Sequence, residues 1–346
     1  MKKIAVMTGG GDCPGLNAVI RSVVLSGSGN GIETLGIHNG WQGLIDGDLE
    51  LLGDASVSGI LSQGGTILGT SRTDPLKNPA DLEKIKKTLQ ATGIDAVVVI
   101  GGDGTLSAAY EISKKGIPLV GIPKTIDNDV SGTDLTVGFD TAVAIVTDAI
   151  DRLHTTAESH HRIMVVEVMG RNAGWIAVMA GLAGGADVIL VPEIPFTIDE
   201  VCRDLKARYM AGKKYSIVVV AEGINHEDIT EAVVPECNRD ECGHEKFVGV
   251  GNLLGKELEH QLGIETRVTV LGHVQRGGTP TAFDRILGTR FGVEAVEQII
   301  AGNTGCMIAL QGSRIGTIPL KDVASRIKPV NQGLLSLVKT VMNRMR

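Results

Sequence analysis

The 346-residue sequence has few aromatic residues and no excess of positive charge. Phe, Trp and Tyr together make up 3% of the chain, too few for the stacking surfaces of proteins that bind single-stranded nucleic acids. A formal net charge of −7 argues against a surface that binds polyanions. No apolar run is long enough to cross a bilayer. We therefore expect neither a nucleic-acid-binding protein nor a membrane protein.

Cysteine is also scarce. The five cysteines are scattered and odd in number, which is typical of a reducing cytoplasm and not of a disulfide framework. The chain enters an apolar run at Ile4, too early for a signal peptide, so we expect a cytoplasmic protein. Cys237, Cys242 and His244 cluster without an evident fourth ligand and off the common zinc spacings, so no zinc site is expected. A lowered thiol pKa is expected at Cys13, before a predicted helix.

Glycine, by contrast, is abundant, with 46 residues, and many glycines follow short apolar runs. Runs rich in Val and Ile that do not alternate with polar residues are typical of strands buried on both faces of a parallel sheet. They span residues 4–7, 96–100, 118–122, 163–168, 188–191, 217–220 and 268–271. Helical spacing of apolar residues lies between them, at 19–24, 80–92, 140–157 and 253–258. This alternation predicts a doubly wound α/β fold, in which ligands bind at the carboxyl ends of strands.

A glycine-rich loop at residues 8–17 follows the first predicted strand. Its glycines would let backbone amides approach a phosphate, and the N-terminus of the next helix favours negative charge. The spacing matches neither the dinucleotide-binding fingerprint nor the Walker loop. A tight strand-to-helix turn without a ligand explains this loop equally well.

The second loop, Gly-Gly-Asp-Gly-Thr at 101–105, also follows a predicted strand. Its glycines leave room for a triphosphate, and Asp103 can bind Mg²⁺ directly or through water. Thr105 can donate its hydroxyl to a phosphate. The alternative is an Asp-Gly turn with Thr105 as a helix cap. Two glycines before the carboxylate, at a strand end, favour the functional interpretation.

The third loop, Pro-Lys-Thr-Ile-Asp-Asn-Asp at 123–129, follows the next predicted strand. Asp127 is a candidate general base for a substrate hydroxyl, and Asp129 would tune and orient it. Thr125 can hydrogen-bond the same hydroxyl or the moving phosphoryl group. A plain polar loop with an Asx-turn is the alternative. Together, the second and third loops supply what phosphoryl transfer requires, because its catalysis is mostly positioning and charge stabilisation.

The second half of the chain adds arginines at strand ends. Arg171 could stabilise charge on a transferring phosphoryl group, and Glu222 could accept hydrogen bonds from sugar hydroxyls. Arginine forks match phosphate geometry, and Arg267 and Arg276 stand at opposite ends of one predicted strand, with His273 between them. One phosphate cannot easily reach both arginines within one subunit. The spacing therefore indicates a site shared between subunits.

These motifs, in this order and over nearly the whole length, resemble those of the 6-phosphofructokinase family. The resemblance implies that fructose 6-phosphate is phosphorylated at its 1-hydroxyl, a committing step of glycolysis, with Mg²⁺ and a phosphoryl donor. It implies two Rossmann-like doubly wound domains with mostly parallel sheets. Residues 1–138 with about 276–324 would bind the donor, and residues 139–275 with about 325–346 would bind fructose 6-phosphate. Similar family members are homotetramers, or homodimers in some branches.

The resemblance also implies roles for individual residues. The donor would be held by Gly11, Arg72, Thr73, Gly102, Asp103, Gly104 and Thr105, with Asp103 carrying the metal. The catalytic residues would be Asp127 as proton acceptor, Thr125, Asp129 and Arg171. The sugar phosphate would contact Thr125, Ile126, Asp127, Met169, Gly170, Arg171, Glu222, His273, Val274, Gln275 and Arg276. Arg162 and Arg267 would reach it from a neighbouring subunit.

Two positions point to different donors. Gly104 resembles ATP-using members of the family, whereas Lys124 resembles pyrophosphate-using members. We favour ATP, because an Asp at position 104 would crowd and repel the α-phosphate, whereas Lys124 adds a cation near the phosphates. Residues 225–262 form an excursion longer than in the short allosteric bacterial enzymes, which indicates the mixed-donor branch. Basic effector ligands of those enzymes are replaced by Leu25, Asp54 and His154, although Arg21 and Lys213 remain, so little response to ADP or phosphoenolpyruvate is expected.

Three other functions compete with this interpretation. A pyrophosphate-dependent enzyme would run reversibly. An NAD or lipid kinase shares Gly-Gly-Asp-Gly-Thr but leaves residues 125–129 and the arginine-bearing strand unexplained. A non-catalytic nucleotide sensor would bind nucleotide without turnover and gives Asp127 no role.

Overall fold

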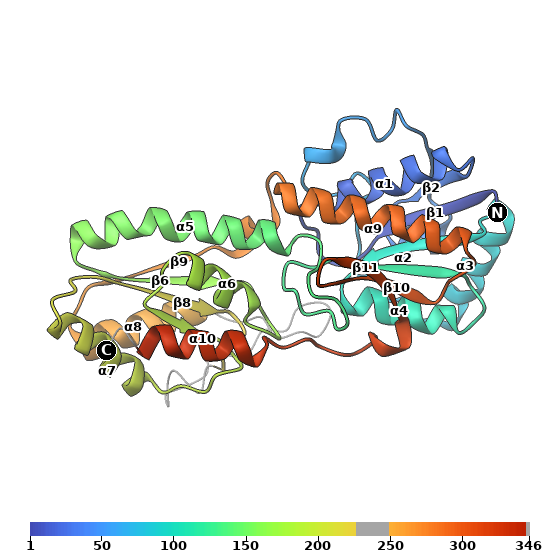
Figure 1. The fold of residues 1–346 in the computed structure, drawn as a ribbon. Helices are drawn as coiled ribbons and strands as arrows, with labels where there is room; N and C mark the ends of the chain where they lie inside the picture. The colour runs from blue at the N-terminus through green and yellow to red at the C-terminus, as the bar shows by residue number, and fades with distance from the viewer. Residues whose placement is uncertain (226–248, 344–346) are drawn as a thin grey trace. The chain divides into compact units, whose positions relative to one another are not determined.

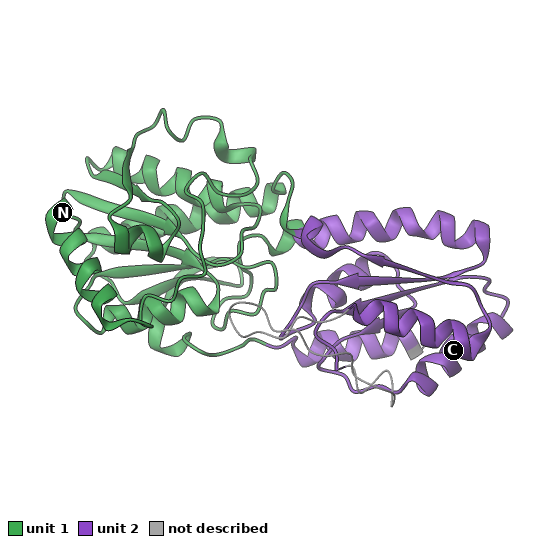
Figure 2. Cartoon of the chain, turned by 180° about the vertical axis from the view of Figure 1, so that it is seen from behind, with its two compact units in different colours: residues 1–141, 276–328 green, residues 142–275, 329–346 purple. Residues whose placement is uncertain are grey.

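The computed structural model describes residues 1–225 and 249–343. The chain divides into two compact units, coloured separately in Figure 2. Unit 1 comprises residues 1–141 and 276–328, and unit 2 comprises residues 142–275 and 329–346. The chain therefore begins in unit 1, crosses to unit 2, returns to unit 1 and crosses to unit 2 a second time. None of the helices in the described ranges is long and apolar enough to cross a bilayer.

Unit 1 is built on a seven-stranded sheet with the order β11-β10-β5-β4-β1-β2-β3. The strands are β1 (Lys3–Thr8), β2 (Glu33–Ile37), β3 (Leu49–Leu52), β4 (Ala96–Gly101), β5 (Leu119–Pro123), β10 (Cys306–Gln311) and β11 (Arg314–Pro319). The five inner strands are parallel, and the two edge strands β3 and β11 pair antiparallel. Every residue of β4 is buried, as its apolar run predicts.

Helices cover both faces of this sheet (Figure 1). One core cluster joins the sheet to α2 (Trp41–Asp46), α3 (Pro79–Thr92) and α4 (Asp103–Ser113). Helices α1 (Leu16–Gly29) and α9 (Ala282–Ile300) pack against each other on the other face. Asn78 caps α3 by accepting a hydrogen bond from the backbone N–H of Ala80. Short 3-10 helices lie at Ile60–Ser62 and Leu320–Asp322.

Unit 2 contains a parallel four-stranded sheet with the order β7-β8-β6-β9. Its strands are β6 (Ile163–Val168), β7 (Val188–Leu190), β8 (Ser216–Ala221) and β9 (Thr266–Val270). Its helices are α5 (Phe139–His160), α6 (Trp175–Ala183), α7 (Ile198–Met210), α8 (Val250–Leu262) and α10 (Gln332–Asn343), with a 3-10 turn at Gly272–Arg276. A core cluster packs α7 and α8 on one face of the sheet, and α5 runs along the other (Figure 1).

The predicted α/β fold is confirmed, and so are all seven predicted strands and all four predicted helices. Four strands, β2, β3, β10 and β11, were not predicted. Strands β3 and β11 are exposed edges with partly polar sequences, so they lack the continuous apolar runs of buried strands. The sequence of β2, Glu-Thr-Leu-Gly-Ile, has no continuous apolar run, and a Cβ atom on its Gly36 would lie 2.6 Å from Leu68.

Candidate active site

The three predicted loops of unit 1 lie side by side, because they follow the neighbouring parallel strands β1, β4 and β5. The N–H of Gly9 donates to the carbonyl of Ile100 (2.9 Å). The N–H of Lys124 donates to the carbonyl of Gly101 (3.0 Å). A Cβ on Gly9 would lie 2.8 Å from Cγ2 of Thr105, so the first two loops are in contact. The predicted phosphate loops and the loop of Asp127 thus form one surface of unit 1.

The first loop also binds the segment that carries two predicted donor residues, Arg72 and Thr73. The N–H of Gly10 donates to the carbonyl of Ser71 (3.0 Å), and Thr70 Oγ1 donates to the carbonyl of Gly10 (2.6 Å). Thr73 Oγ1 donates to Gln42 Oε1 (3.1 Å), at the start of α2. These bonds bring residues 70–73, which are far from Gly11 in sequence, to the loop where a donor would bind.

The second loop opens helix α4, with Asp103 in its first turn and Gly104 exposed. A Cβ at Gly104 would meet no heavy atom within 4 Å, so any side chain at this position would project into open space. Asp103 Oδ1 accepts hydrogen bonds from the N–H of Ser325 (3.1 Å) and from Ser107 Oγ (3.4 Å). Both bonds fix the orientation of the carboxylate at the N-terminus of α4.

The carboxylate of Asp103 is the group in this loop that could bind Mg²⁺. Protein sites for Mg²⁺ use one or two carboxylates together with substrate phosphates and water. Both donors to Asp103 reach the same oxygen, and a carboxylate offers about four lone-pair positions, so it keeps capacity for a cation. In the described residues no group of three or more His, Cys, Asp or Glu side chains could hold a metal by itself. The chain therefore fits Mg²⁺ that arrives with a phosphate ligand.

The third loop is held in a defined conformation around Asp127. The N–H of Asp127 donates to Thr125 Oγ1 (3.1 Å), and Thr136 Oγ1 donates to the carbonyl of Thr125 (2.7 Å). Asn128 adopts a left-handed conformation with φ 51°. Its Oδ1 accepts from the N–H of Thr136 (3.1 Å), and its Nδ2 donates to the carbonyl of Asp134 (3.2 Å). The half-buried Asp127 thus stands on a backbone that is fixed on both sides.

Lys124 has a different environment from the one expected near phosphates. The residue is 2% exposed, and Nζ donates to the carbonyl of Gly9 (2.9 Å) and to the carbonyl of Gly11. Burial lowers the pKa of the ammonium. Lys124 therefore ties the third loop to the first glycine loop from inside the protein.

Cys13 is a correction to the sequence analysis. The thiol is fully buried and donates to the carbonyl of Val137 (3.3 Å). Burial raises its pKa to about 12, because the thiolate would lose its hydration. The expected lowering by the helix N-terminus is wrong, since desolvation outweighs it.

Arg276 lies in unit 1, against the first loop. Its Nη1 donates to the carbonyl of Asp12 (3.2 Å). A Cβ on Gly11 would lie 2.3 Å from the same nitrogen, so the glycine at position 11 makes room for the guanidinium. The structure thus places Arg276 beside predicted donor residues. Its predicted contact with the sugar phosphate stays a prediction.

Unit 2 brings a second group of predicted residues together at the carboxyl ends of β6, β8 and β9. The N–H of Met169 donates to Gln275 Oε1 (3.2 Å). The N–H of Glu222 donates to the carbonyl of Val168 (2.9 Å), and the N–H of Gly223 to that of Gly170 (3.2 Å). Met169, Glu222 and Gly170 therefore lie together at the carboxyl end of this sheet. Gly170 has φ 135°, which an L side chain rarely adopts.

The 3-10 turn Gly272–Arg276, which follows β9, contains both buried and exposed residues. Gln275 is fully buried, and its Nε2 donates to the carbonyl of Gly272 (3.0 Å). It therefore supports the Met169 loop with its side chain. His273 and Val274 are exposed, so they are accessible to a ligand.

Arg162 and Arg267 lie at the opposite, amino end of the same sheet, where Glu265 pairs with both. Arg162 Nε lies 2.7 Å from Glu265 Oε2, and Arg267 pairs with the other oxygen. The six residues of β6 span roughly 20 Å at about 3.3 Å per residue, which separates these arginines from Gly170. The predicted contact of these two arginines with the sugar phosphate of a neighbouring subunit stays a prediction.

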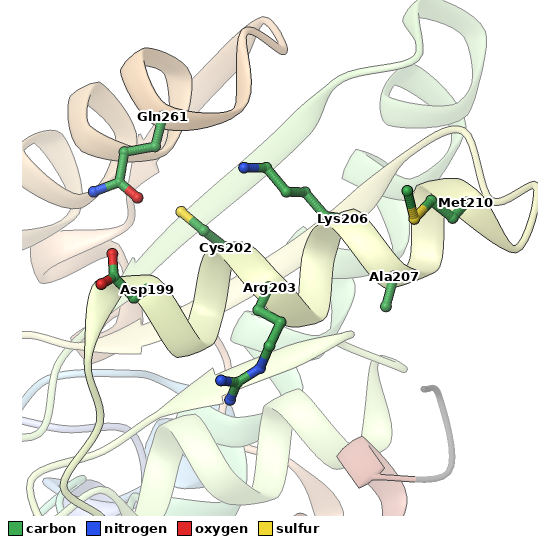
Figure 3. Close-up of a pocket in the computed structure, with 7 residues that line it drawn as sticks. All are labelled: Asp199, Cys202, Arg203, Lys206, Ala207, Met210 and Gln261. Atoms are coloured by element: carbon green, nitrogen blue, oxygen red, sulfur yellow. The ribbon is translucent and has the colours of Figure 1, made fainter.

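Other predicted features lie outside these two groups. His154 Nε2 lies 2.7 Å from the carbonyl oxygen of Gly184. Cys237, Cys242 and His244 are outside the described residues. A groove of about 460 Å³ lies between α7 and α8 of unit 2, where Cys202 and Lys206 of α7 project toward the helix that carries Gln261 (Figure 3). It is walled by helices and not by strand ends, so it is not part of either group.

Two residues that shape the site were not identified as site residues from the sequence. In the sequence, Asn128 stands out only as part of the polar motif at 123–129. Lys328 Nζ donates to Asn128 Oδ1 (3.0 Å), 200 residues away in sequence. The sequence around Lys328 does not predict this contact, because only the fold brings Lys328 and Asn128 together.

Known proteins resemble this chain over nearly its full length. The family model described as Phosphofructokinase matches residues 3–299. An ATP-dependent 6-phosphofructokinase of Corynebacterium efficiens is 50% identical over 330 residues, 95% of each chain. A pyrophosphate–fructose 6-phosphate 1-phosphotransferase of Streptomyces coelicolor is 52% identical over 334 residues, 96% of this chain and 97% of its own. The crystal structure of Pichia pastoris phosphofructokinase in the T-state has a TM-score of 0.83 and 35% identity, over 99% of this chain and 39% of that chain. This chain belongs to the phosphofructokinase family.

Proposed function

We propose that this protein is an ATP-dependent 6-phosphofructokinase, which transfers the γ-phosphoryl group of ATP to the 1-hydroxyl of fructose 6-phosphate. The observation that carries the proposal is the meeting of three loops at the ends of β1, β4 and β5. Two of them present glycine backbone and a helix N-terminus, which suit phosphates. The third presents a fixed carboxylate, Asp127, which suits a hydroxyl proton.

Asp127 would act as the proton acceptor. As the 1-hydroxyl oxygen forms its bond to the γ-phosphorus, the bond from that phosphorus to ADP breaks, and the hydroxyl proton passes to the carboxylate. The hydrogen bond from the N–H of Asp127 to Thr125 and the folded loop around Asn128 support this role. They hold the backbone of the base in one conformation. Thr125 and Asp129 flank it, and Arg171 would offset the charge on the moving group.

Asp103 would carry Mg²⁺ together with the donor phosphates. The metal would neutralise the charge that develops on these phosphates when the donor is bound. Gly11, Arg72, Thr73 and the segment Gly102–Thr105 would hold the rest of the donor. The contacts of residues 70–73 with the first loop support their place in this set.

ATP is favoured over pyrophosphate by the open space at Gly104. A side chain there would project into the open space at α4. In the proposed enzyme the inner phosphate and nucleoside of ATP would use this space. The Corynebacterium efficiens relative is named as ATP-dependent. A reversible pyrophosphate-dependent enzyme is the second candidate, because Lys124 is present and the Streptomyces coelicolor relative is named for pyrophosphate.

We infer that fructose 6-phosphate binds at the strand ends of unit 2, with Met169, Gly170, Arg171, Glu222 and His273 as its contacts. Arg162 and Arg267 would come from a neighbouring subunit, which makes the protein a homotetramer or homodimer. The separation of these arginines from Gly170 supports a shared site. Ile126, Val274 and Gln275 are further contacts that the family resemblance implies. Because the side chain of Gln275 is buried, it would contact the sugar phosphate through its backbone.

A mixing experiment tests the shared site. Asp127→Ser and Arg267→Ala subunits would each have low activity alone. Hybrids formed by mixing and reassociation should regain activity, because some sites would combine an intact Asp127 with an intact Arg267. Hybrids no more active than the average of the parents would place both residues in one subunit's site.

The proposed function is tested by initial rates with fructose 6-phosphate and Mg²⁺, measured in parallel with ATP and with pyrophosphate. Turnover with ATP alone is the expected result. Turnover with pyrophosphate alone would favour the reversible enzyme. Nucleotide binding without turnover would favour the sensor and leave Asp127 without a role.

A further inference from the structure

Lys328 joins the end of unit 1 to the loop that carries Asp127. Its Nζ donates to Asn128 Oδ1 (3.0 Å), to the carbonyl of Thr133 (2.8 Å) and to the carbonyl of Asp134 (2.9 Å). An ammonium has three N–H donors, and here each has an acceptor on the same loop. The side chain is therefore bound to residues 128–134 through all three donors.

The backbone beside Lys328 repeats the attachment. The N–H of Lys328 donates to the carbonyl of Asp129 (2.8 Å), and Ile327 forms an antiparallel bridge with Val130. The segment 327–328 thus pairs with the chain just after Asp127 through both backbone and side chain. It is also the last part of unit 1 before the chain passes to Pro329 in unit 2.

Asn128 explains why this attachment bears on the reaction. It stands between Asp127 and Asp129 and has φ 51°, a conformation that costs energy in a residue other than glycine. Such a conformation persists only when the surroundings hold it. Its Oδ1 receives both Lys328 Nζ and the N–H of Thr136, so the cation helps to keep the turn that aims Asp127.

We propose that Lys328 is a positioning residue for phosphoryl transfer, which holds the turn at Asn128 so that Asp127 meets the substrate hydroxyl, without itself touching substrate or donor. This inference rests on the proposed function. It predicts a loss in the chemical step and not in substrate binding, because only the aim of the base changes.

The charge state of Lys328 gives an independent readout. Burial lowers its pKa to about 8, and Asp134 and Asp129, the charged groups that face it, oppose the shift. The neutral amine has two N–H donors and a lone pair for three acceptors, so the turn should loosen as Lys328 loses its proton. The kcat of the wild-type enzyme should therefore fall above about pH 8.

The experiment compares Lys328→Met and Lys328→Arg with Lys321→Met, an exposed lysine in the same segment of unit 1. Lys328→Met should lower kcat by roughly 10- to 100-fold, since a misplacement of about 1 Å can cost about 100-fold. The KM values for both substrates should change less than about threefold. Lys328→Arg should regain part of kcat and lack the alkaline decline, because a guanidinium does not deprotonate in this range. Lys321→Met should behave as the wild type.

A second experiment measures whether the effects of replacing Lys328 and Asn128 on kcat are coupled. In an Asn128→Ala background, Lys328→Met should cost far less in kcat than in the wild type, because both changes remove the same link. Independent, multiplicative losses would overturn the proposal, as would a Lys328→Met enzyme with wild-type kcat. If Lys328→Met does not fold, the pH profile of Lys328→Arg decides, and an unchanged alkaline decline would refute the role.

Hydrogen exchange separates failure of this inference from failure of the proposed function. If the wild type turns over neither donor, the proposed function is wrong, but the link can still be measured. The N–H of Thr136, which Asn128 protects, should exchange faster in Lys328→Met than in Lys321→Met. Equal exchange in the two variants would show that Lys328 does not hold the turn.

Discussion

Replacing Lys124 by Met tests whether the buried ammonium shapes the donor loop or contacts the donor. Met has a similar length and an apolar end, so the change removes the charge and keeps most of the volume. It removes the hydrogen bonds from Nζ to the carbonyls of Gly9 and Gly11. The loop between β1 and α1 would then lose its tie to the loop after β5.

The expected change in stability is small because two large effects oppose each other. Each hydrogen bond from a charged group contributes about 1.5–3 kcal/mol, so the two bonds give about 3–6 kcal/mol. Burying an ammonium costs several kcal/mol, and the lowered pKa of Lys124 has this desolvation as its main cause. The two nearly cancel, so the free energy of unfolding should change by less than about 2 kcal/mol.

Lys124→Met should raise the KM for the phosphoryl donor strongly, whichever donor is used. Gly9 and Gly11 would no longer be held by Lys124. The loop would then present its backbone to a phosphate less well, so KM should rise roughly tenfold for ATP and for any pyrophosphate turnover alike, about 1.4 kcal/mol each. The KM for fructose 6-phosphate should stay within about twofold. A Lys84→Met variant, on the exposed side of α3, is the control.

Initial-rate kinetics with each donor and chemical denaturation of both variants provide the measurements. A loss confined to pyrophosphate would refute the reasoning, because it would mean that the ammonium leaves its buried position to bind that donor. A loss of stability above about 4 kcal/mol would also refute it, since the desolvation cost would then be far smaller than assumed.

Three further predictions concern single positions. Asp127→Ser should lower kcat by at least roughly 10²–10⁴ with KM largely kept, the usual contribution of a general base, and near-normal turnover in a steady-state assay would contradict its role. Gly104→Asp should lower kcat/KM for ATP by more than roughly 100-fold, and any pyrophosphate turnover should be spared, because the new carboxylate enters the open space at α4; equal rates with ATP would disprove this account. Asp284 is buried, which raises its pKa from 3.8 to about 6, so the folded state binds the proton more tightly than the unfolded state. Stability should therefore fall by about 3 kcal/mol as pH rises from about 4 to 6, and thermal melts of Asp284→Asn should lack this step, because the amide does not ionise. The variant should also be less stable at pH 4–5, because its NH₂ would face the N–H of Gly138 or that of Thr141, which donate to different oxygens of Asp284.

The parts of the fold that could be predicted are those in which a single segment carries the whole signal. Strand β4 is an unbroken apolar run followed by Gly-Gly-Asp-Gly, and burial on both faces gives it that composition. Strand β11 alternates between partly buried and exposed residues and pairs with β10 in a hairpin. Its short, half-exposed sequence resembles that of a surface loop, so it was missed.

The candidate site divides in the same way. The three loops were predictable because each follows its own strand and neighbouring parallel strands end at one edge. The roles of Lys124 and Lys328 were not, because each depends on a partner more than a hundred residues away. Cys13 shows the same limit: the helix after it is visible in the sequence, but the burial that raises its pKa is not.

Gly104 and Lys124 conflict as donor signals only if both are assumed to face the donor. In the structure Gly104 borders open space, whereas Lys124 is enclosed and bonded to backbone carbonyls. A side chain at position 104 would act directly, through volume and charge against a nucleotide. A side chain at position 124 would act indirectly, through the shape of a loop that any phosphate donor uses. On the proposed function, the first would choose between donors and the second would only set how well both bind, so a buried Lys124 is compatible with ATP. Relatives named for ATP and for pyrophosphate are each about half identical to this chain. Overall similarity therefore does not select a donor.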